Sequence, residues 1–482
     1  MNSRPEPLDV LVIGGGVSGL ATAWHLLSYG FETQLWESAP QVGGKIHSNL
    51  HQGWLTEAGA TWLMDPVGNT ADVLEAVGLG PLLTRKQPDV TRYLLRNGAL
   101  QNVPITVGRL LGSGLFSLAG CLRLAAEPLV FRQRRSDETV SDFVTRRFGR
   151  EVLKYGIEPY IAGVLASDPE RAEAKATLPR LTELEERFGS VTAGMLYGRL
   201  FGSGKRCKPE AVSFQGGMQS LTDCLSVSVR PVLGREAKSI NRHPAGWQVE
   251  ASDGTVVLAR KLVLGTPALE AAQLLANIDH ELAHFIGGIA YAPVMVVHLG
   301  FTRETVRHPL DGTGFLVPGC ENRAVNGCLW PASIFSNRAP AGHRLLSSYL
   351  GGARHPNALL DDDKSVIGKV LSDLEPLLGL RGDPVMTRVD RHPRGLPLYF
   401  GAYTERLRII AERLKHSPGI HLVAAYAGGV SVRDRLAQAD VVAEQINRQL
   451  RSARRARQWS IVDPERLPLG SATAGGPSTQ TM

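Results

Sequence analysis

Apolar and polar residues near the amino terminus follow a pattern that predicts a strand, a tight turn and a helix. The apolar run Val10–Ile13 ends in Gly14-Gly15-Gly16-Val17-Ser18-Gly19, and the following segment LATAWHLLSYG carries apolar residues at helical spacing. A second short segment, Thr33–Trp36, predicts the neighbouring strand. This order is typical of the start of a doubly wound α/β sheet.

The next part of the chain changes to a helical pattern. Residues 104–135 are mostly small and apolar, and mixed amphipathic segments follow, so 104–204 is predicted as a helical insertion. In the apolar part leucines recur at helical spacing, at Leu111, Leu115, Leu118, Leu122 and Leu129. Such a segment is either a buried pair of helices or a helix that rests on lipid with its arginines at the headgroups.

Beyond residue 210, alternating apolar and polar residues predict strands. The six segments are Arg235–Ile240, Gly246–Ala251, Thr255–Leu264, Pro293–Phe301, Gly312–Pro318 and Leu345–Leu350. A helix over Ser365–Leu378 and a closing strand and helix from His421 onward complete the pattern. The predicted fold class is α/β, or α+β for the chain as a whole.

The composition is that of an ordinary globular protein. The 482 residues are 43% hydrophobic and 21% charged, and this length predicts two or three domains. The net charge of +7 includes five arginines within Arg448–Arg457, so nucleic acid is not an expected partner of the nearly neutral remainder. Five cysteines without CxxC spacing indicate neither a disulfide framework nor a metal site. The apolar segment Leu110–Leu122, which carries no charged residue, is shorter than the roughly 20 residues that span a bilayer.

The glycine-rich turn has the spacing of a dinucleotide site. Gly14 permits the tight turn, Gly16 lets the backbone approach a pyrophosphate, and Gly19 lets the helix pack closely on the strand. The helix that follows offers free N–H groups and the positive end of its dipole. Glu37 follows the second predicted strand, where a carboxylate can accept hydrogen bonds from both ribose hydroxyls.

A second glycine pair points to a longer cofactor. Gly43-Gly44-Lys45 places a cation where it can lie against the pyrophosphate, an addition that FAD needs and NAD does not. The chain contains no second complete GxGxxG motif, so a separate nicotinamide domain is not expected. The organic substrate is then the expected reductant, with dioxygen or a quinone as the electron acceptor.

At these positions residues 8–64 resemble the flavin-containing amine oxidase superfamily. The segments GIEPYIAGVLASDPER (156–171) and LPRLTELEERFGSV (178–191) resemble, more narrowly, the protoporphyrinogen oxidase family, as does SFQGGM (213–218). The resemblance covers about residues 8–447. It implies a Rossmann-type FAD-binding domain, a mixed-sheet substrate domain and a helical insertion.

The resemblance also implies how the chain is divided. Residues 1–85, 205–290 and 400–450 form the expected FAD-binding domain, and residues 86–103 and 291–399 form the substrate-binding domain. The helical domain of residues 104–204 is membrane-associated in one of its two interpretations. The basic segment 451–482 is predicted to be a disordered tail.

The cofactor implied by the resemblance is FAD, held without a covalent bond since no cysteine follows Cys328. The implied contacts lie in the glycine turns, in the segment after Glu57, in the strand near Ala237 and in the closing motif. They are Gly14, Gly16, Val17, Ser18, Gly19, Glu37, Gly43, Gly44, Lys45, Gly59, Ala60, Thr61, Trp62, Ala237, Val430, Ser431 and Val432.

In this family the flavin carries out the oxidation, so the resemblance implies no catalytic side chain. Arg92 matches an arginine that binds a substrate propionate, Leu316 a leucine that packs on a pyrrole ring, and Gly163 a glycine at the reacting edge. The chain departs from the family at Thr313, where an aromatic residue is usual, and at His392, where a tryptophan is usual. Both positions are expected in the substrate pocket.

Three functions remain open at this stage. The first is an FAD-dependent oxidase that converts a porphyrinogen to a porphyrin with dioxygen as acceptor. The second is a diverged paralogue, an oxidase or dehydrogenase of an amine, an imine or another secondary-metabolite intermediate, in which Tyr399 and Tyr426 supply two aromatic rings before the flavin. The third is a non-catalytic flavoprotein that sequesters a tetrapyrrole.

The expected partner is a small-molecule substrate of the tetrapyrrole class. A membrane surface contact and a homodimer stay open. The expected location is the cytoplasm, with peripheral attachment to the inner membrane as the alternative.

Overall fold

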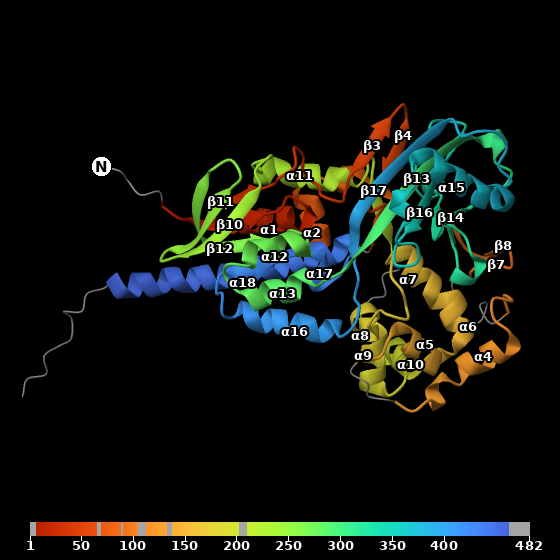
Figure 1. The fold of residues 1–482 in the computed structure, drawn as a ribbon, viewed down its shortest axis with the longest axis horizontal. Helices are drawn as coiled ribbons and strands as arrows, with labels where there is room; N and C mark the ends of the chain where they lie inside the picture. The colour runs from red at the N-terminus through yellow and green to blue at the C-terminus, as the bar shows by residue number, and fades with distance from the viewer. Residues whose placement is uncertain are drawn as a thin grey trace, which may run out of the picture.

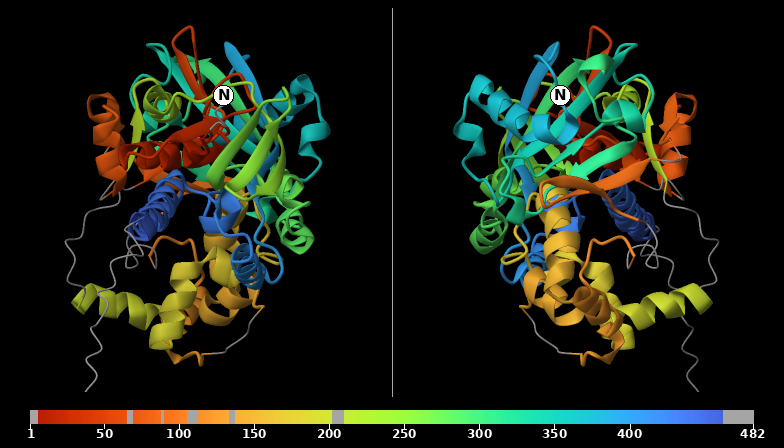
Figure 2. Two further views of the ribbon diagram at one scale, coloured as in Figure 1. Left: turned by 90° about the vertical axis from the view of Figure 1, so that its left-hand side faces the viewer. Right: turned by 90° about the vertical axis from the view of Figure 1, so that its right-hand side faces the viewer.

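The computed structural model describes residues 6–64, 69–87, 90–104, 112–132, 137–201 and 210–461. Figure 1 shows two sheets side by side, with the helices of residues 118–201 gathered below the second sheet. Figure 2 shows the same helices protruding from the body formed by the two sheets.

The first sheet has the order β10-β11-β12-β1-β2, with β18 also paired to β12. Strand β1 is parallel to β2 and β12, whereas β10, β11 and β12 form an antiparallel meander. Its strands are β1 (Leu8–Ile13), β2 (Thr33–Trp36), β10 (Ala237–His243), β11 (Gly246–Ala251), β12 (Val256–Leu264) and β18 (Ile420–Leu422).

Helices cover both faces of this sheet because its central strand alternates between two cores. Val10 and Val12 of β1 pack into one apolar core, and Leu11 and Ile13 pack into the other. The first core is completed by α1 (Val17–Ser28), α2 (Asn69–Ala76), α11 (Gln219–Val229) and α18 (Val432–Ile461). The second is completed by α12 (Ala268–Leu275), α13 (His280–Gly287), α16 (Tyr403–Leu414) and α17 (Ala425–Gly428). This is the Rossmann-type arrangement that the sequence predicted.

The second sheet is mixed and has the order β17-β13-β16-β15-β14-β7-β8. All its neighbouring strands are antiparallel except β7 and β14. The strands are β7 (Thr91–Arg96), β8 (Ala99–Asn102), β13 (Tyr291–Thr302), β14 (Gly312–Leu316), β15 (Gly327–Leu329), β16 (His343–Gly351) and β17 (Met386–Pro397). Helix α15 (Asp363–Leu378) shares the core of this sheet.

Two small sheets complete the β-structure of the described residues. The hairpin of β3 (Ser48–His51) and β4 (Trp54–Glu57) lies against the second sheet, since a Cβ on Gly300 of β13 would lie 2.4 Å from the ring of Trp54. The other sheet has the order β5-β9-β6. Its strands are β5 (Leu63–Met64), β6 (Leu83–Arg85) and β9 (Ala211–Phe214).

A buried ionic cluster holds the helical insertion together. Arg147 is fully buried and donates to the carboxylates of Glu127 and Glu185. Glu127, also fully buried, accepts a hydrogen bond from Ser190 at 2.7 Å. The helices are α4 (Leu118–Ala125), α5 (Val140–Phe148), α6 (Arg150–Val152), α7 (Glu158–Val164), α8 (Ala174–Thr177), α9 (Pro179–Phe188) and α10 (Val191–Phe201), with a π-helical turn at Leu153–Ile157 between α6 and α7.

The interpretation of 104–135 as a buried pair of helices is wrong for the described leucines of α4 and the turn after it. Leu118, Leu122 and Leu129 are 78%, 63% and 81% exposed, and only Leu115 is buried. Leu111 lies outside the described residues. No helix in the described ranges is both long enough and apolar enough to span a bilayer.

The boundary of the carboxy-terminal tail also differs from the prediction. Helix α18 continues to Ile461, so the first part of 451–482 is helical and not disordered. Its buried face packs on α1 as far as Leu450, and Arg454 still pairs with Asp9 of β1 at 2.7 Å. The remainder of the tail lies outside the described residues.

Candidate functional site

Two glycine turns meet at the carboxyl end of β1. Gly16 and Gly43 form a parallel β-bridge, and the N–H of Gly43 donates to the carbonyl of Gly15 at 2.9 Å. Gly14 and Gly43 have φ angles of +107° and +114°, a backbone conformation that favours glycine. A Cβ on Gly44 would lie 3.5 Å from the Cα of Gly16, so the two turns are in van der Waals contact.

The glycines of the first turn differ in how closely other atoms surround them. A Cβ on Gly19 would lie 2.0 Å from the carbonyl oxygen of Gly14, so α1 packs directly on the turn. A Cβ on Gly16 would meet no atom within 4 Å. Val17 and Ser18 are the first, buried residues of α1. The backbone at Gly16 therefore borders open space at a helix N terminus, where a phosphate can be held.

Backbone N–H groups hold the carboxylate of Glu37. Its Oε2 accepts a hydrogen bond from Gly15 at 2.5 Å and its Oε1 accepts one from Ala39 at 2.8 Å. The backbone of Glu37 also pairs with the segment 232–235, which leads into Ala237 at the start of β10. The structure thus brings Glu37 to the first glycine turn, with Ala237 on the neighbouring segment.

Lys45 extends from the second glycine turn toward the second sheet. Its Nζ donates to the carbonyl of Gly395 in β17 at 2.5 Å and lies 5.1 Å from the ring centre of Tyr291. Although the residue as a whole is exposed, the desolvation of its ammonium group lowers its pKa to about 8. Glu270 opposes this shift and Arg394 adds to it.

The segment that follows β4 joins the two sheets. A Cβ on Gly59 would lie 2.1 Å from the carbonyl oxygen of Lys45, and the hydroxyls of Thr61 and Tyr349 are 3.2 Å apart. Ala60 lies at the edge of the core around α1. Trp62 packs instead beside the ring of Phe335. The residues expected to contact FAD in this segment therefore bridge the glycine turns and β16.

Glu57, the last residue of β4, immediately precedes this segment, and its carboxylate is buried. It accepts hydrogen bonds from the hydroxyl of Ser48 at 2.6 Å and from the N–H of Met218 at 2.9 Å. The guanidinium of Arg338 is 3.9 Å away. Burial outweighs these interactions and raises the pKa of Glu57 to about 7. No local sequence pattern predicts this cluster, because its members come from distant segments.

The closing motif begins α18. The hydroxyl of Ser431 accepts a hydrogen bond from the N–H of Asp434 at 3.1 Å, and the carboxylate of Asp434 accepts one from Ser431 at 3.3 Å. This reciprocal cap fixes the N terminus of α18. Val432 is buried against α1, and Val430 immediately precedes the cap.

Two residues expected to contact substrate come together. A Cβ on Gly163 of α7 would lie 2.6 Å from Cδ2 of Leu316 in β14 and 3.1 Å from the carbonyl oxygen of Asn326. Only a glycine allows α7 to approach the strand this closely. The helical insertion and the second sheet therefore meet at Gly163.

Arg92 lies in β7, next to β14, and is exposed. Leu316 of β14 pairs with Leu94 of β7, so these two side chains lie on the same face of the sheet. Arg92 is two residues from Leu94 on the same strand and therefore shares that face. Thr313 lies three residues before Leu316 in β14, and its hydroxyl is 3.5 Å from the carbonyl oxygen of Thr91. The sequence did not predict that Lys86 lies near Arg92. Burial and the positive charge of Arg92 lower the pKa of the Lys86 ammonium group.

Other expected substrate contacts have protein partners. Nε2 of His392 lies 2.7 Å from the carbonyl oxygen of Ala58, so this ring braces the segment after β4. The hydroxyl of Tyr399 donates to the carbonyl of Ala425 at 3.3 Å. Tyr426 is fully buried in the second core of the first sheet, which corrects the idea that it forms an aromatic pair with Tyr399 before the flavin.

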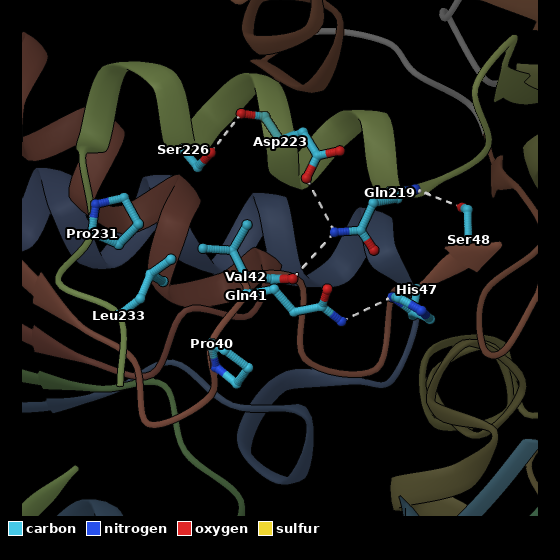
Figure 3. A pocket seen from close by; sticks show the side chains of 10 residues that line it. All are labelled: Pro40, Gln41, Val42, His47, Ser48, Gln219, Asp223, Ser226, Pro231 and Leu233. Atoms are coloured by element: carbon cyan, nitrogen blue, oxygen red, sulfur yellow. Dashed lines mark hydrogen bonds between the residues drawn. The ribbon is translucent and has the colours of Figure 1, made fainter. Parts of the chain in front are cut away.

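A pocket of about 420 Å³ lies behind the second glycine turn (Figure 3). None of the residues expected to contact FAD or substrate lines it. Gln219 in its wall donates to the carbonyl of Val42 at 3.2 Å, and its amide would lie 3.1 Å from a Cβ on Gly43. Gln219 therefore supports the turn from outside.

The residues present fit the FAD that the sequence implies. The opening at Gly16 has room for a pyrophosphate, and the hydroxyl of Thr266, beside Gly14, is buried without a hydrogen-bond partner among the described residues. The glycine turns, Lys45 and the N terminus of α18 would hold the cofactor.

The chain is similar in sequence and in fold to known proteins. The family model of flavin-containing amine oxidoreductases matches residues 17–447. Mitochondrial protoporphyrinogen oxidase of Nicotiana tabacum is 28% identical over 88% of this chain and 91% of that protein. Coproporphyrinogen III oxidase of Bacillus subtilis is 26% identical over 88% and 95%. A crystal structure from Exiguobacterium sp. 255-15, provisionally named a protoporphyrinogen oxidase, has a TM-score of 0.77 at 22% identity and covers 91% of this chain and 98% of its own.

The match to the family model spans most of the chain, begins at Val17 at the end of the first glycine turn, and includes the second glycine turn and the closing motif. The chain therefore belongs to the flavin-containing amine oxidoreductase family and is an FAD-dependent oxidoreductase.

Proposed function

We propose that the protein is an FAD-dependent oxidase that dehydrogenates a carboxylated porphyrinogen to a porphyrin, with dioxygen as the electron acceptor. The observation that carries this proposal is the meeting of Gly163 with Leu316, on the sheet face that also bears Arg92. The relatives named as protoporphyrinogen and coproporphyrinogen oxidases support the substrate class.

When bound, FAD accepts the hydride, so the protein's own task is to bind and orient the substrate. Arg92 and the nearby Lys86 would pair with carboxylates at the substrate rim, since their charges reinforce each other toward an anion. Leu316 and the backbone of Gly163 would form the apolar walls against which the macrocycle packs. The close approach of α7 to β14 limits water beside the reacting carbon.

The test is anaerobic reduction of the bound flavin. The FAD-loaded protein is mixed with protoporphyrinogen IX, coproporphyrinogen III or a panel of amines, and bleaching of the flavin absorbance is followed. We expect the porphyrinogens to bleach it and the amines to leave it oxidised. Bleaching by an amine alone would favour the diverged-paralogue alternative, and a flavin that no candidate reduces would favour a carrier.

Arg92→Ala tests the anchor. Loss of one charge-assisted pair is expected to raise KM for a porphyrinogen about tenfold while FAD stays bound. Arg187→Ala on α9, an exposed arginine far from β7 in sequence and fold, serves as the control. Unchanged KM in Arg92→Ala would remove Arg92 from the substrate site.

We also propose that the helical insertion contacts a membrane surface from the cytoplasmic side. Its exposed apolar side chains lie on α4, on α10 and just after α4, namely Leu118, Leu122, Leu129, Phe131, Met195, Leu196, Leu200 and Phe201. Such an extended apolar surface marks an interaction site. Cosedimentation with anionic lipid vesicles should be lost in Leu122→Ser/Leu129→Ser. A concentration-dependent dimer, also lost in that variant, would instead show that a second copy covers this face.

A further inference from the structure

A buried arginine lies behind the N terminus of α18 with part of its guanidinium unpaired. Arg435 is 4% exposed. Its Nη1 donates to Oε1 of Gln438, whereas its Nε and Nη2 have no hydrogen-bond partner among the described residues. Buried guanidinium groups are normally paired, because an uncompensated charge in the interior is strongly destabilising.

The groups that act on this charge do not neutralise it. Asp434 is exposed, and its Oδ2 is taken up by the N–H of Ser431 in the helix cap. Tyr399 is uncharged at neutral pH, because burial raises its pKa to about 12. Desolvation exceeds the attraction of Asp434 and lowers the pKa of Arg435, yet an arginine stays protonated at every physiological pH.

The guanidinium is placed beside the turn that precedes α18. A Cβ on Gly428 would lie 2.8 Å from Nη2 of Arg435, and Gly428 ends α17 two residues before Val430. Long side chains on a helix point back toward its N terminus. The charge of Arg435 and the positive end of the α18 dipole therefore act on the same place, the segment Val430–Val432.

We propose that Arg435 is the fixed countercharge for the reduced flavin and that it raises the reduction potential of the bound cofactor. This inference rests on the proposed FAD site. A substrate hydride adds one proton and two electrons to the isoalloxazine, so the ring system gains a negative charge unless a further proton follows. A cation that is already desolvated stabilises that charge more than a solvated one does, because the low local dielectric strengthens the attraction.

The proposal also explains why an unpaired charge is kept in the interior. Replacement of a buried charge by an apolar side chain of similar length commonly stabilises a protein. Arg435→Met should therefore raise the thermal midpoint of the flavin-free protein. The same substitution should weaken the preference for reduced over oxidised FAD, so stability and redox function change in opposite directions.

The experiment compares Arg435→Met, Arg435→Lys and, as a control on the exposed side of the same turn, Arg433→Met. For each, the thermal midpoint is measured without FAD, and the midpoint potential and sulfite affinity of the bound flavin are measured with it. In Arg435→Met we expect the affinity ratio for reduced over oxidised FAD to fall at least tenfold, which equals a potential about 30 mV more negative. Sulfite, whose flavin adduct is also anionic, should bind at least tenfold more weakly.

Arg435→Lys and Arg433→Met should stay within threefold of the wild type in both flavin measurements. A normal potential and normal sulfite affinity in FAD-loaded Arg435→Met would overturn the proposal, and an accompanying rise in substrate KM would assign Arg435 to the substrate instead. Failure of the wild-type chain to bind FAD is a different result, which would refute the proposed function itself.

Discussion

The buried carboxyl group of Glu57 makes the stability of the protein depend on pH in a direction that can be worked out. Its pKa is raised from 4.5 to about 7 in the folded protein because desolvation outweighs its hydrogen bonds and the nearby Arg338. Between these two values the folded state binds a proton that the unfolded chain has lost. The stabilising contribution is therefore fully present below about pH 4.5 and is lost as the pH rises through about 7.

The size of the effect follows from the shift. A difference of roughly 2.5 pKa units at 1.36 kcal/mol per unit gives about 3 kcal/mol, and because the side chain is almost completely buried no reduction for solvent screening is needed. At about 2.1 cal/mol/K per residue, the unfolding entropy of a chain of this length is about 1 kcal/mol/K. The loss of the proton from Glu57 should thus lower the thermal midpoint of the wild-type protein by roughly 3 °C between pH 4.5 and pH 8.

Glu57→Gln keeps the shape of the side chain and removes its titration. The assay is the thermal midpoint of wild type and variant at half-unit steps from pH 4.5 to pH 8, without FAD, so that cofactor binding does not contribute. The difference between the two curves isolates Glu57, because every other group titrates in both proteins. We expect wild type to lose about 3 °C relative to the variant as the pH rises. Two parallel curves would refute the argument, since Glu57 would then titrate alike in the folded and unfolded states.

Three further predictions test the packing. Gly16→Ala should weaken FAD binding by at least tenfold and leave the flavin-free fold intact, because the added Cβ has open space. Gly19→Ala should also lower the thermal midpoint of the flavin-free protein, because its Cβ would collide with the carbonyl oxygen of Gly14. Equal effects of the two substitutions on the flavin-free protein would contradict this difference. Gly163→Ala should reduce kcat/KM for a porphyrinogen with FAD still bound, and Leu316→Ala in the same chain should restore part of it if the 2.6 Å contact is the cause. Arg147→Met should cost about 3–5 kcal/mol, because Glu127 loses its buried ion-pair partner and Glu185 keeps only Arg146. The loss should be visible as early melting of the helical insertion in hydrogen exchange, and wild-type protection there would rule this out.

Local sequence was sufficient for the parts of the fold that short-range rules determine. The run Val10–Ile13, the glycine turn and the helix after it form a unit whose spacing is imposed by one close approach, between Gly19 and the turn. Predicted strands such as Gly246–Ala251 agree with β11 because their alternation reflects one buried and one partly exposed face. Such patterns hold wherever the neighbouring strand is also close in sequence.

Contacts between side chains that are distant in sequence could not be predicted from such local patterns. His392 was expected in the substrate pocket, yet its partner is the carbonyl of Ala58, more than 300 residues away in sequence. Leu118 and Leu122 have the helical spacing of a core, but no element among the described residues covers their face. Apolar periodicity indicates which side of a helix is apolar and not what packs on it.

Polar contacts at both ends of α7 explain how the helical insertion would set the width of the proposed substrate pocket. At one end Glu158 pairs with Arg354 and accepts the N–H of Gly319 at 3.0 Å, which ties the helix to the second sheet. Beyond the other end Glu173 accepts the N–H of Thr404 at 2.6 Å, which ties the insertion to α16 beside the first sheet. Gly163 lies between these two ties, so neither sheet can move away without breaking a charged contact. The contact at Gly163 is therefore preorganised, and a change at either tie should alter substrate affinity before it alters FAD binding.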